Sequence, residues 1–146
     1  MNADKRYYLD TSALLPYYRE ESASREVQEI LLSLKPPIFI SDLTRAEFAS
    51  AVSRWVRMDE LTEEQAGLIE KTLIKDIDSG LYSQCSIINS HYRQAERWLS
   101  GRHTSLRTLD ALHLACCWSI NAEMITYDVT LQQSAEYFGI NVWRHE

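Results

Sequence analysis

Thr108-Leu109-Asp110-Ala111-Leu112-His113-Leu114-Ala115 is the stretch on which the fold prediction depends, because it reads as an apolar helix with a carboxylate in its first turn. The hydroxyl of Thr108 suits an N-cap position, which would put Asp110 at the positive end of the helix dipole. Taken alone, this position favours simple complementation of the dipole. Three further acids elsewhere in the chain favour a metal-ligating carboxylate instead.

Two of these acids follow predicted strands. Residues 6–9 are β-favouring and end at Asp10, after which Thr11 and Ser12 predict a hydroxyl-capped helix. Residues 123–127 read as a second buried strand, and Asp128 leads from it into another predicted helix. Both carboxylates are therefore expected at the carboxyl ends of strands.

The third acid, Glu47, lies near the start of a predicted helix over residues 43–58. Ala49, Val52 and Val56 follow helical spacing there, and neighbouring aromatic residues broaden the apolar face. Ligands of an open parallel sheet bind outside the carboxyl ends of its strands, where strand-end and helix-start acids can converge. The sequence thus predicts one acidic pocket built from four separate segments.

The remaining pattern alternates between strands and helices. Strands are expected at residues 6–9, 38–41, 82–87, 123–127 and 140–143. Helical segments fill the gaps, which predicts an α/β fold with a central parallel sheet of four or five strands and helices on both faces.

Cap and breaker residues indicate where the helices begin and end. Ser22 can cap a helix that Pro36-Pro37 ends, and Thr62-Glu63-Glu64-Gln65 is a capping-box pattern for a helix ending near Gly80. Pro16 predicts that the helix after Ser12 is short, bent or shifted.

Composition indicates one domain over residues 1–146. The chain is 45% hydrophobic and has four tryptophans, which suits one well-buried core. No apolar segment approaches the length of a membrane span, and the first residues do not resemble a secretory signal, so we expect a cytoplasmic protein.

The three cysteines show no zinc-ligand spacing. Cys116 and Cys117 are adjacent on a predicted apolar helix, and Cys85 is distant from them in the sequence. Buried, reduced thiols are favoured over disulfides or metal ligands.

Clustered acids create an electrostatic problem that a cation would solve. Two carboxylates about 6 Å apart repel by about 3 kcal/mol at an effective dielectric constant of about 20, and four acids make several such pairs. Such a group must bind protons or cations, or spread apart. Oxygen ligands suit Mg²⁺ or Mn²⁺.

Four motifs carry a resemblance to a known family. They are Leu9-Asp10-Thr11-Ser12-Ala13-Leu14, Thr44-Arg45-Ala46-Glu47-Phe48, the segment Arg107 to Ala115, and Ile125-Thr126-Tyr127-Asp128. They resemble the ordered acidic motifs of PIN-domain ribonucleases, most closely the VapC toxin branch. The resemblance covers nearly the whole chain, although residues 58–100 match only in length and helical character.

This resemblance implies a single PIN-like domain that acts as a metal-dependent endoribonuclease. It implies Asp10, Glu47, Asp110 and Asp128 as the acidic site, with Ser12 and Thr126 as neighbouring polar positions. Asp10, Asp110 and Asp128 would hold the metal, and Glu47 would bind it through water or position the attacking water. It also implies a cognate antitoxin partner and a homodimer.

The net charge of −6 argues against a simple nucleic-acid-binding module, which would normally have a basic patch. Without the four negative charges of the proposed site, the net charge is −2. The remaining surface is therefore nearly balanced and could carry local basic patches. Arg102, His103 and Arg107, with Arg93 and Arg97 before them, are candidates for contacts to RNA phosphates. The alternative for each is a solvated surface position.

Two other functions fit less well. His103 and His113 could act in a metal-free ribonuclease, but a structural role for His113, bonded to Asp110 or facing solvent, is favoured. A non-catalytic α/β interaction module with a regulatory cation site would explain the acidity, but not why all four acids lie in nuclease-like contexts. A haloacid-dehalogenase phosphatase would need a second Asp where Ser12 stands, and phosphate-binding glycine motifs are absent.

Overall fold

The computed structural model of the protein describes residues 5–144, which form a four-stranded parallel sheet with helices on both faces. The strand order is β3-β2-β1-β4. The strands are β1 (Arg6–Leu9), β2 (Ile38–Ser41), β3 (Tyr82–Cys85) and β4 (Ala122–Ile125). The predicted α/β class and parallel sheet are confirmed.

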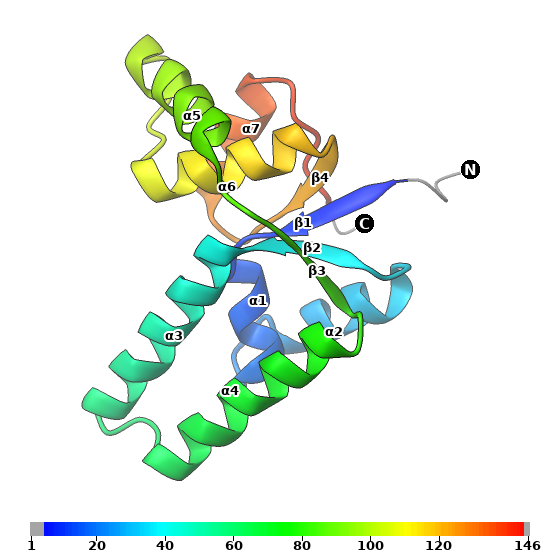
Figure 1. Ribbon diagram of the computed structural model, residues 1–146, viewed down its shortest axis with the longest axis vertical. Helices are drawn as coiled ribbons and strands as arrows, with labels where there is room; N and C mark the ends of the chain where they lie inside the picture. Colours follow the sequence, from blue (N-terminus) through cyan, green and yellow to red (C-terminus); the bar gives the residue numbers. More distant parts are fainter. Residues whose placement is uncertain (1–4, 145–146) are drawn as a thin grey trace.

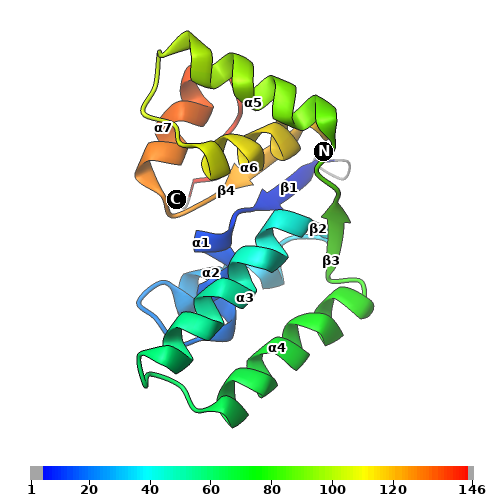
Figure 2. The same ribbon diagram turned by 60° about the vertical axis from the view of Figure 1, so that its left-hand side comes forward.

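Seven helices connect and cover these strands within the described residues. They are α1 (Thr11–Tyr18), α2 (Ser24–Ser33), α3 (Asp42–Arg57), α4 (Glu63–Asp78), α5 (Asn89–Gly101), α6 (Thr108–Ser119) and α7 (Val129–Tyr137). Helices α1 to α4 lie on one side of the sheet and α5 to α7 on the other (Figure 1). Figure 2 shows α3 and α4 extending away from the sheet as a pair of long helices. No helix in the described part of the chain is long and apolar enough to cross a membrane.

Alternating strand residues build a separate core on each face of the sheet. Tyr8 and Met124 pack with residues of α5, α6 and α7, whereas Leu9 and Ile125 pack with residues of α1 to α4. All four side chains are at most 2% exposed. Because successive strand residues point to opposite faces, two short strands supply both cores. In α3, Phe48 and Val52 are buried as the spacing indicates, but Ala49 is exposed.

Three strand predictions differ from the structure. β3 ends at Cys85, two residues before the predicted end, and β4 begins one residue before and ends two residues before its predicted range. Residues 140–143 do not form a strand: Val142 makes an isolated parallel bridge to Met124, with backbone bonds from Met124 N to Asn141 O and from Trp143 N to Met124 O. The segment therefore touches the sheet edge at one residue, and the sheet has the lower of the two expected strand numbers.

Three predicted helix caps were wrong. Asp10, not a hydroxyl residue, caps α1, and its carboxylate accepts a bond from Ala13 N. α6 begins at Thr108 itself with Arg107 at the N-cap, and α2 begins after Ala23 rather than Ser22. In each case a helix has the predicted place, but the tertiary contacts of its first turn shift its start by one or two residues.

Other boundary predictions were correct. Thr62 caps α4 through the predicted capping box with Gln65, and Gly80, with a φ of +91°, follows the helix end. α1 contains Pro16 and is only eight residues long. α2 ends before the two prolines that precede β2.

Candidate acidic site at the carboxyl ends of the strands

Asp10 lies at the end of β1 and is 4% exposed. Its Oδ1 accepts hydrogen bonds from Ser12 Oγ at 2.8 Å and Ala13 N at 3.2 Å, and its Oδ2 accepts from Thr126 Oγ1 at 2.8 Å. Burial raises the pKa of Asp10 from 3.8 to about 6, against the opposing effects of His113 and these hydrogen bonds. The two polar residues predicted beside the acids both contact Asp10.

Thr126 also links Asp10 to Asp128, at the end of the neighbouring strand. Its Oγ1 accepts a bond from Asp128 N at 3.0 Å. The Asp128 side chain caps α7 by accepting from Leu131 N at 3.1 Å. β1 and β4 are paired in parallel, so both strand-end acids reach the same edge of the sheet.

Asp110 enters this edge from the first turn of α6. Its Oδ2 is buried and has no hydrogen-bond partner among residues 5–144. The nearest cation is Arg107 Nε at 3.7 Å, too far for a hydrogen bond, on a side chain that is 82% exposed. Burial and the charges of Asp128 and Glu47 raise the pKa of Asp110, while Arg107 and His113 oppose them. Buried polar atoms are rarely left without a partner, so this oxygen needs an explanation.

Glu47 comes to the same place from α3. Its Oε1 accepts hydrogen bonds from Thr11 Oγ1 at 2.5 Å and from His113 Nε2 at 2.6 Å. Burial acts to raise the pKa of Glu47, but the bonds from His113 and Thr11 outweigh it, and the pKa is lowered. Glu47 is therefore held as a carboxylate.

His113 is the residue of this region whose contacts the sequence did not predict. It is 2% exposed and bonds to Glu47, rather than to Asp110 or solvent. Its Nδ1 lies 2.7 Å from the Tyr8 hydroxyl, which donates to Ser41 Oγ at 2.9 Å. A histidine inside the apolar run of α6 was the only signal in the sequence, and it did not identify the partner.

The four acids are thus neighbours in the fold, and we call Asp10, Glu47, Asp110 and Asp128 the acidic pocket. Their oxygens offer the hard ligands that Mg²⁺ and Mn²⁺ prefer. Two features of the structure fit a divalent cation here. One is the unpartnered Oδ2 of Asp110, and the other is the raised pKa of both Asp10 and Asp110.

Of the candidate RNA-contacting residues, only Arg107 lies beside the acidic pocket. Arg102 is at the end of α5, where its Nη1 donates to Ser100 O. His103 is exposed and stacks on Tyr137 of α7 with ring centroids 5.6 Å apart. These two residues lie at the end of α5 and on the α5–α6 connection.

Three aromatic residues, Tyr17, Tyr18 and Trp55, pack against the core on the α1–α4 side. Trp55 is partly buried, and the Arg19 guanidinium lies 4.2 Å from the centre of its ring. Tyr18 donates to Asp76 Oδ2 at 2.6 Å and contacts Phe48 edge to face. Tyr17 contacts Tyr18 in the same way.

Comparison with solved structures identifies several proteins with this fold. FitAcB from Neisseria gonorrhoeae has a TM-score of 0.74 at 18% identity, covering 94% of this chain and 96% of that chain. The sarcin-ricin loop cleaving toxin VapC20 from Mycobacterium tuberculosis has a TM-score of 0.70 at 15% identity, covering 95% and 99%. VapBC2 from Rickettsia felis, bound to a promoter DNA fragment, has a TM-score of 0.63 at 15% identity, covering 94% and 96%. At these identities the likeness establishes the fold.

Comparison with curated protein sequences finds no match. The PIN domain family, however, matches residues 7–136, a range that contains all four acids and nearly all of the described chain. This chain therefore belongs to the PIN domain family.

Proposed function

We propose that this protein is a metal-dependent endoribonuclease, the toxin of a VapBC-type toxin–antitoxin pair, that acts in the cytoplasm to inhibit translation or growth. The observation that carries the proposal is the buried Oδ2 of Asp110, which has no hydrogen-bond partner among residues 5–144 and faces the charges of Asp128 and Glu47. Membership of the PIN domain family supports the reaction class. Similar folds in proteins named as toxins support the biological role.

In this proposal Asp10, Asp110 and Asp128 hold Mg²⁺ or Mn²⁺. The bound cation would neutralise negative charge on the scissile phosphate and lower the pKa of water at the site. The raised pKa of Asp10 and Asp110 means that these carboxyls keep their protons to a higher pH than ordinary acids when no cation is bound. Cation binding therefore displaces protons and strengthens as the pH rises.

Glu47 acts on the attacking water. Both of its side-chain hydrogen bonds from described residues go to Oε1, which leaves Oε2 to accept a bond from that water and position it. The lowered pKa keeps Glu47 ionised as a hydrogen-bond acceptor. Water attacks phosphorus in line and releases a proton to solvent, the bond to the 3′-oxygen breaks, and that oxygen takes up a proton from solvent, so the products carry a 5′-phosphate and a 3′-hydroxyl.

Arg107, with Arg102 and His103 further out, would contact phosphates that flank the scissile bond. An exposed guanidinium beside a carboxylate can release the acid and bind a phosphate with little cost, because surface ion pairs contribute only about 0–1 kcal/mol. The Arg107–Asp110 pair, at 3.7 Å with Arg107 82% exposed, is of this kind.

The partner would be a cognate antitoxin that blocks the acidic pocket. Structures with this fold include toxin–antitoxin complexes from Klebsiella pneumoniae and Haemophilus influenzae. An antitoxin helix or tail that brings a basic side chain to the four acids would match their charge and displace the cation. We also expect this chain to form a homodimer.

Cleavage of a pool of structured RNAs tests the proposed function. The purified protein is assayed with Mg²⁺, Mn²⁺ or chelator beside Asp110→Asn, with Glu63→Gln as the control for an exposed acid in the first turn of another helix. We expect cation-dependent cleavage that leaves 5′-phosphate ends, is lost in Asp110→Asn and is retained in Glu63→Gln. Cyclic phosphate products, or cleavage in chelator, would contradict the mechanism.

A further inference from the structure

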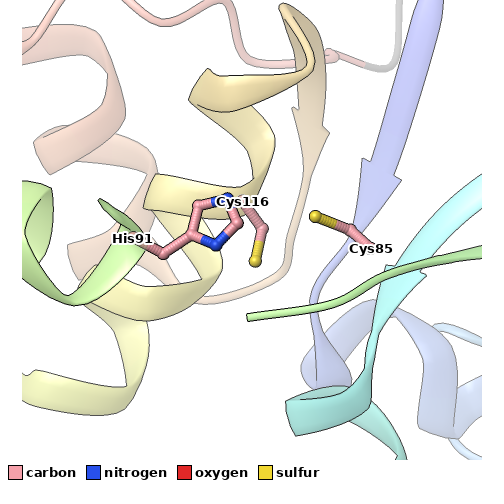
Figure 3. A group of neighbouring side chains, drawn as sticks. All are labelled: Cys85, His91 and Cys116. Atoms are coloured by element: carbon pink, nitrogen blue, oxygen red, sulfur yellow. The ribbon is translucent and has the colours of Figure 1, made fainter. Parts of the chain in front are cut away.

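A second group of ligand-type side chains lies on the α5–α7 side of the sheet. Cys85 ends β3, His91 is in the first turn of α5 and Cys116 is in the middle of α6. One ligand atom from each of the three lies within 4.8 Å of the other two. Figure 3 shows the sulfur of Cys85 pointing toward Cys116 and the ring of His91. We call these three residues the Cys–His cluster.

The spacing of the cluster is close to that of a metal site. Zinc–sulfur bonds of about 2.3 Å and zinc–nitrogen bonds of about 2.0 Å at tetrahedral angles separate neighbouring ligand atoms by roughly 3.5–3.8 Å. The observed limit of 4.8 Å exceeds this by about one ångström, which rotation of cysteine side chains can close.

The His91 ring is already oriented by its own hydrogen bonds. Its Nδ1 accepts from Ile88 N at 3.0 Å, and its Nε2 lies 3.0 Å from Ser119 Oγ. Ser119 Oγ in turn donates to Cys116 O at 2.8 Å. A cation at Nδ1 would replace the bond from Ile88 N, while Nε2–H would still donate to Ser119 Oγ and hold the ring as in metal-bound histidines.

Charge balance also suits a divalent cation. Two thiolates and a neutral imidazole compensate a charge of +2, so the occupied site would be neutral in an environment where Cys116 and His91 are buried. Without a cation, burial and the neighbouring Cys85 raise the pKa of Cys116. The Cys116 thiol is therefore neutral when no cation is bound.

Asp42 adds a negative charge nearby. Its Oδ1 accepts bonds from Leu43 N and Ile87 N, both at 3.1 Å, which ties the segment after β3 to the start of α3. Burial lowers the pKa of His91, and the Asp42 charge opposes this effect. The same charge would favour a cation in the cluster.

Thiolate and imidazole ligands select borderline-soft cations, in contrast to the oxygen ligands of the acidic pocket. We propose that Cys85, His91 and Cys116 bind Zn²⁺ at a second site, separate from the acidic pocket, with water in the fourth position on the partly exposed Cys85 side. Bound zinc would join the end of β3 to α5 and α6. It would thus tie the sheet edge to the helical layer that carries Asp110.

Cobalt titration tests this site directly, because a sulfur-to-cobalt charge-transfer band reports only sulfur ligands. The reduced protein is titrated with Co²⁺ beside Cys85→Ser, with Cys117→Ser as the matched control. Cys117 is the buried neighbour of Cys116, but its sulfur is committed to Ala122 O at 3.2 Å. We expect saturation at one cobalt per chain, a band lost or strongly reduced in Cys85→Ser and unchanged in Cys117→Ser, and displacement of cobalt by Zn²⁺.

Two further variants separate zinc binding from folding and from the acidic pocket. His91→Asn retains an acceptor for Ile88 N but lacks the imidazole, so it should fold and bind cobalt at least about tenfold more weakly. Asp110→Asn should keep the full band. Zinc should raise the melting temperature of the metal-free wild type but not of Cys85→Ser. The proposal is overturned if folded wild type gives no charge-transfer band, or if Cys85→Ser binds cobalt as the wild type does.

Discussion

The acidic pocket and the Cys–His cluster are both built from separate elements, but they differ in how far the local sequence indicates their members. Three of the four acids are close to the start of a helix: Asp10 and Asp128 cap helices, and Asp110 is in a first turn. In the Cys–His cluster, Cys85 ends β3 and His91 is in the first turn of α5, but Cys116 is one of two adjacent cysteines within α6. Local sequence does not indicate which of these two cysteines faces Cys85 and His91.

Helix phase explains why the cluster could not be read from the sequence. An α-helix turns about 100° per residue, so two adjacent cysteines point in different directions. In α6 it is Cys116 that joins Cys85 and His91, whereas Cys117 bonds to Ala122 O. The choice between them depends on how α6 packs against α5 and β3.

The largest expected effect that separates the two sites is that of Asp128→Asn. Asn can still cap α7, so the fold should persist. Loss of one proposed cation ligand should reduce cation-dependent RNA cleavage by about a hundredfold or more, equivalent to about 3 kcal/mol. The cobalt–thiolate band should be unaffected. Cleavage assays and absorption spectra on the same preparation make the measurement, and a joint loss of both signals would indicate one coupled site instead of two.

The pH dependence of stability should show the cost of burying Asp10 as a charge. Because the folded pKa of Asp10 is raised from 3.8 to about 6, the folded state holds a proton that the unfolded state has released. The contribution of Asp10 to the free energy of unfolding is fully present below about pH 4. It is lost as the pH rises through 6, and the total loss is roughly 3 kcal/mol.

Asp10→Asn removes this titration and should raise the free energy of unfolding of the cation-free protein near pH 7, with little change near pH 4. Urea unfolding in the presence of chelator at the two pH values measures the difference. An equal effect of the substitution at both pH values would show that burial of the Asp10 charge is not its source.

A smaller effect should follow from Tyr8→Phe, which removes the hydroxyl that bonds to His113 and Ser41. We expect a stability loss of about 1–3 kcal/mol and a several-fold reduction in cleavage, because His113 then holds Glu47 less firmly. Tyr82→Phe is the matched control on the opposite face, since it removes a hydroxyl bonded to Tyr18 at 2.9 Å. Equal loss of cleavage in both variants would assign the effect to general destabilisation.

The smallest expected effect is that of Arg107→Ala on RNA binding. Loss of one phosphate contact should weaken RNA binding modestly. It should also reduce, by about one, the slope of the logarithm of the binding constant against the logarithm of the salt concentration. Arg97→Ala is the control, because Arg97 is exposed on α5 and bonds to Gln94. If both substitutions change the salt slope equally, Arg107 has no special place beside the acidic pocket.

Sequence reasoning predicted the order of strands and helices and placed the four acids near one edge of the sheet. It succeeded where local rules decide the outcome, as in the capping box of Thr62 and the strand end before Asp10. It failed at residues 140–143 and at the end of β4, because strand length depends on how far a neighbouring strand continues to pair.

The sequence by itself therefore determined the α/β alternation and the acids near strand and helix ends, because these follow from periodicity and capping chemistry. Only the tertiary structure decided that His113 bonds to Glu47 and Tyr8, and that Cys116, not Cys117, meets Cys85 and His91. Those contacts join residues from 25 to 105 positions apart in the chain. The packing of helices on the sheet decides them, and no local pattern records that packing.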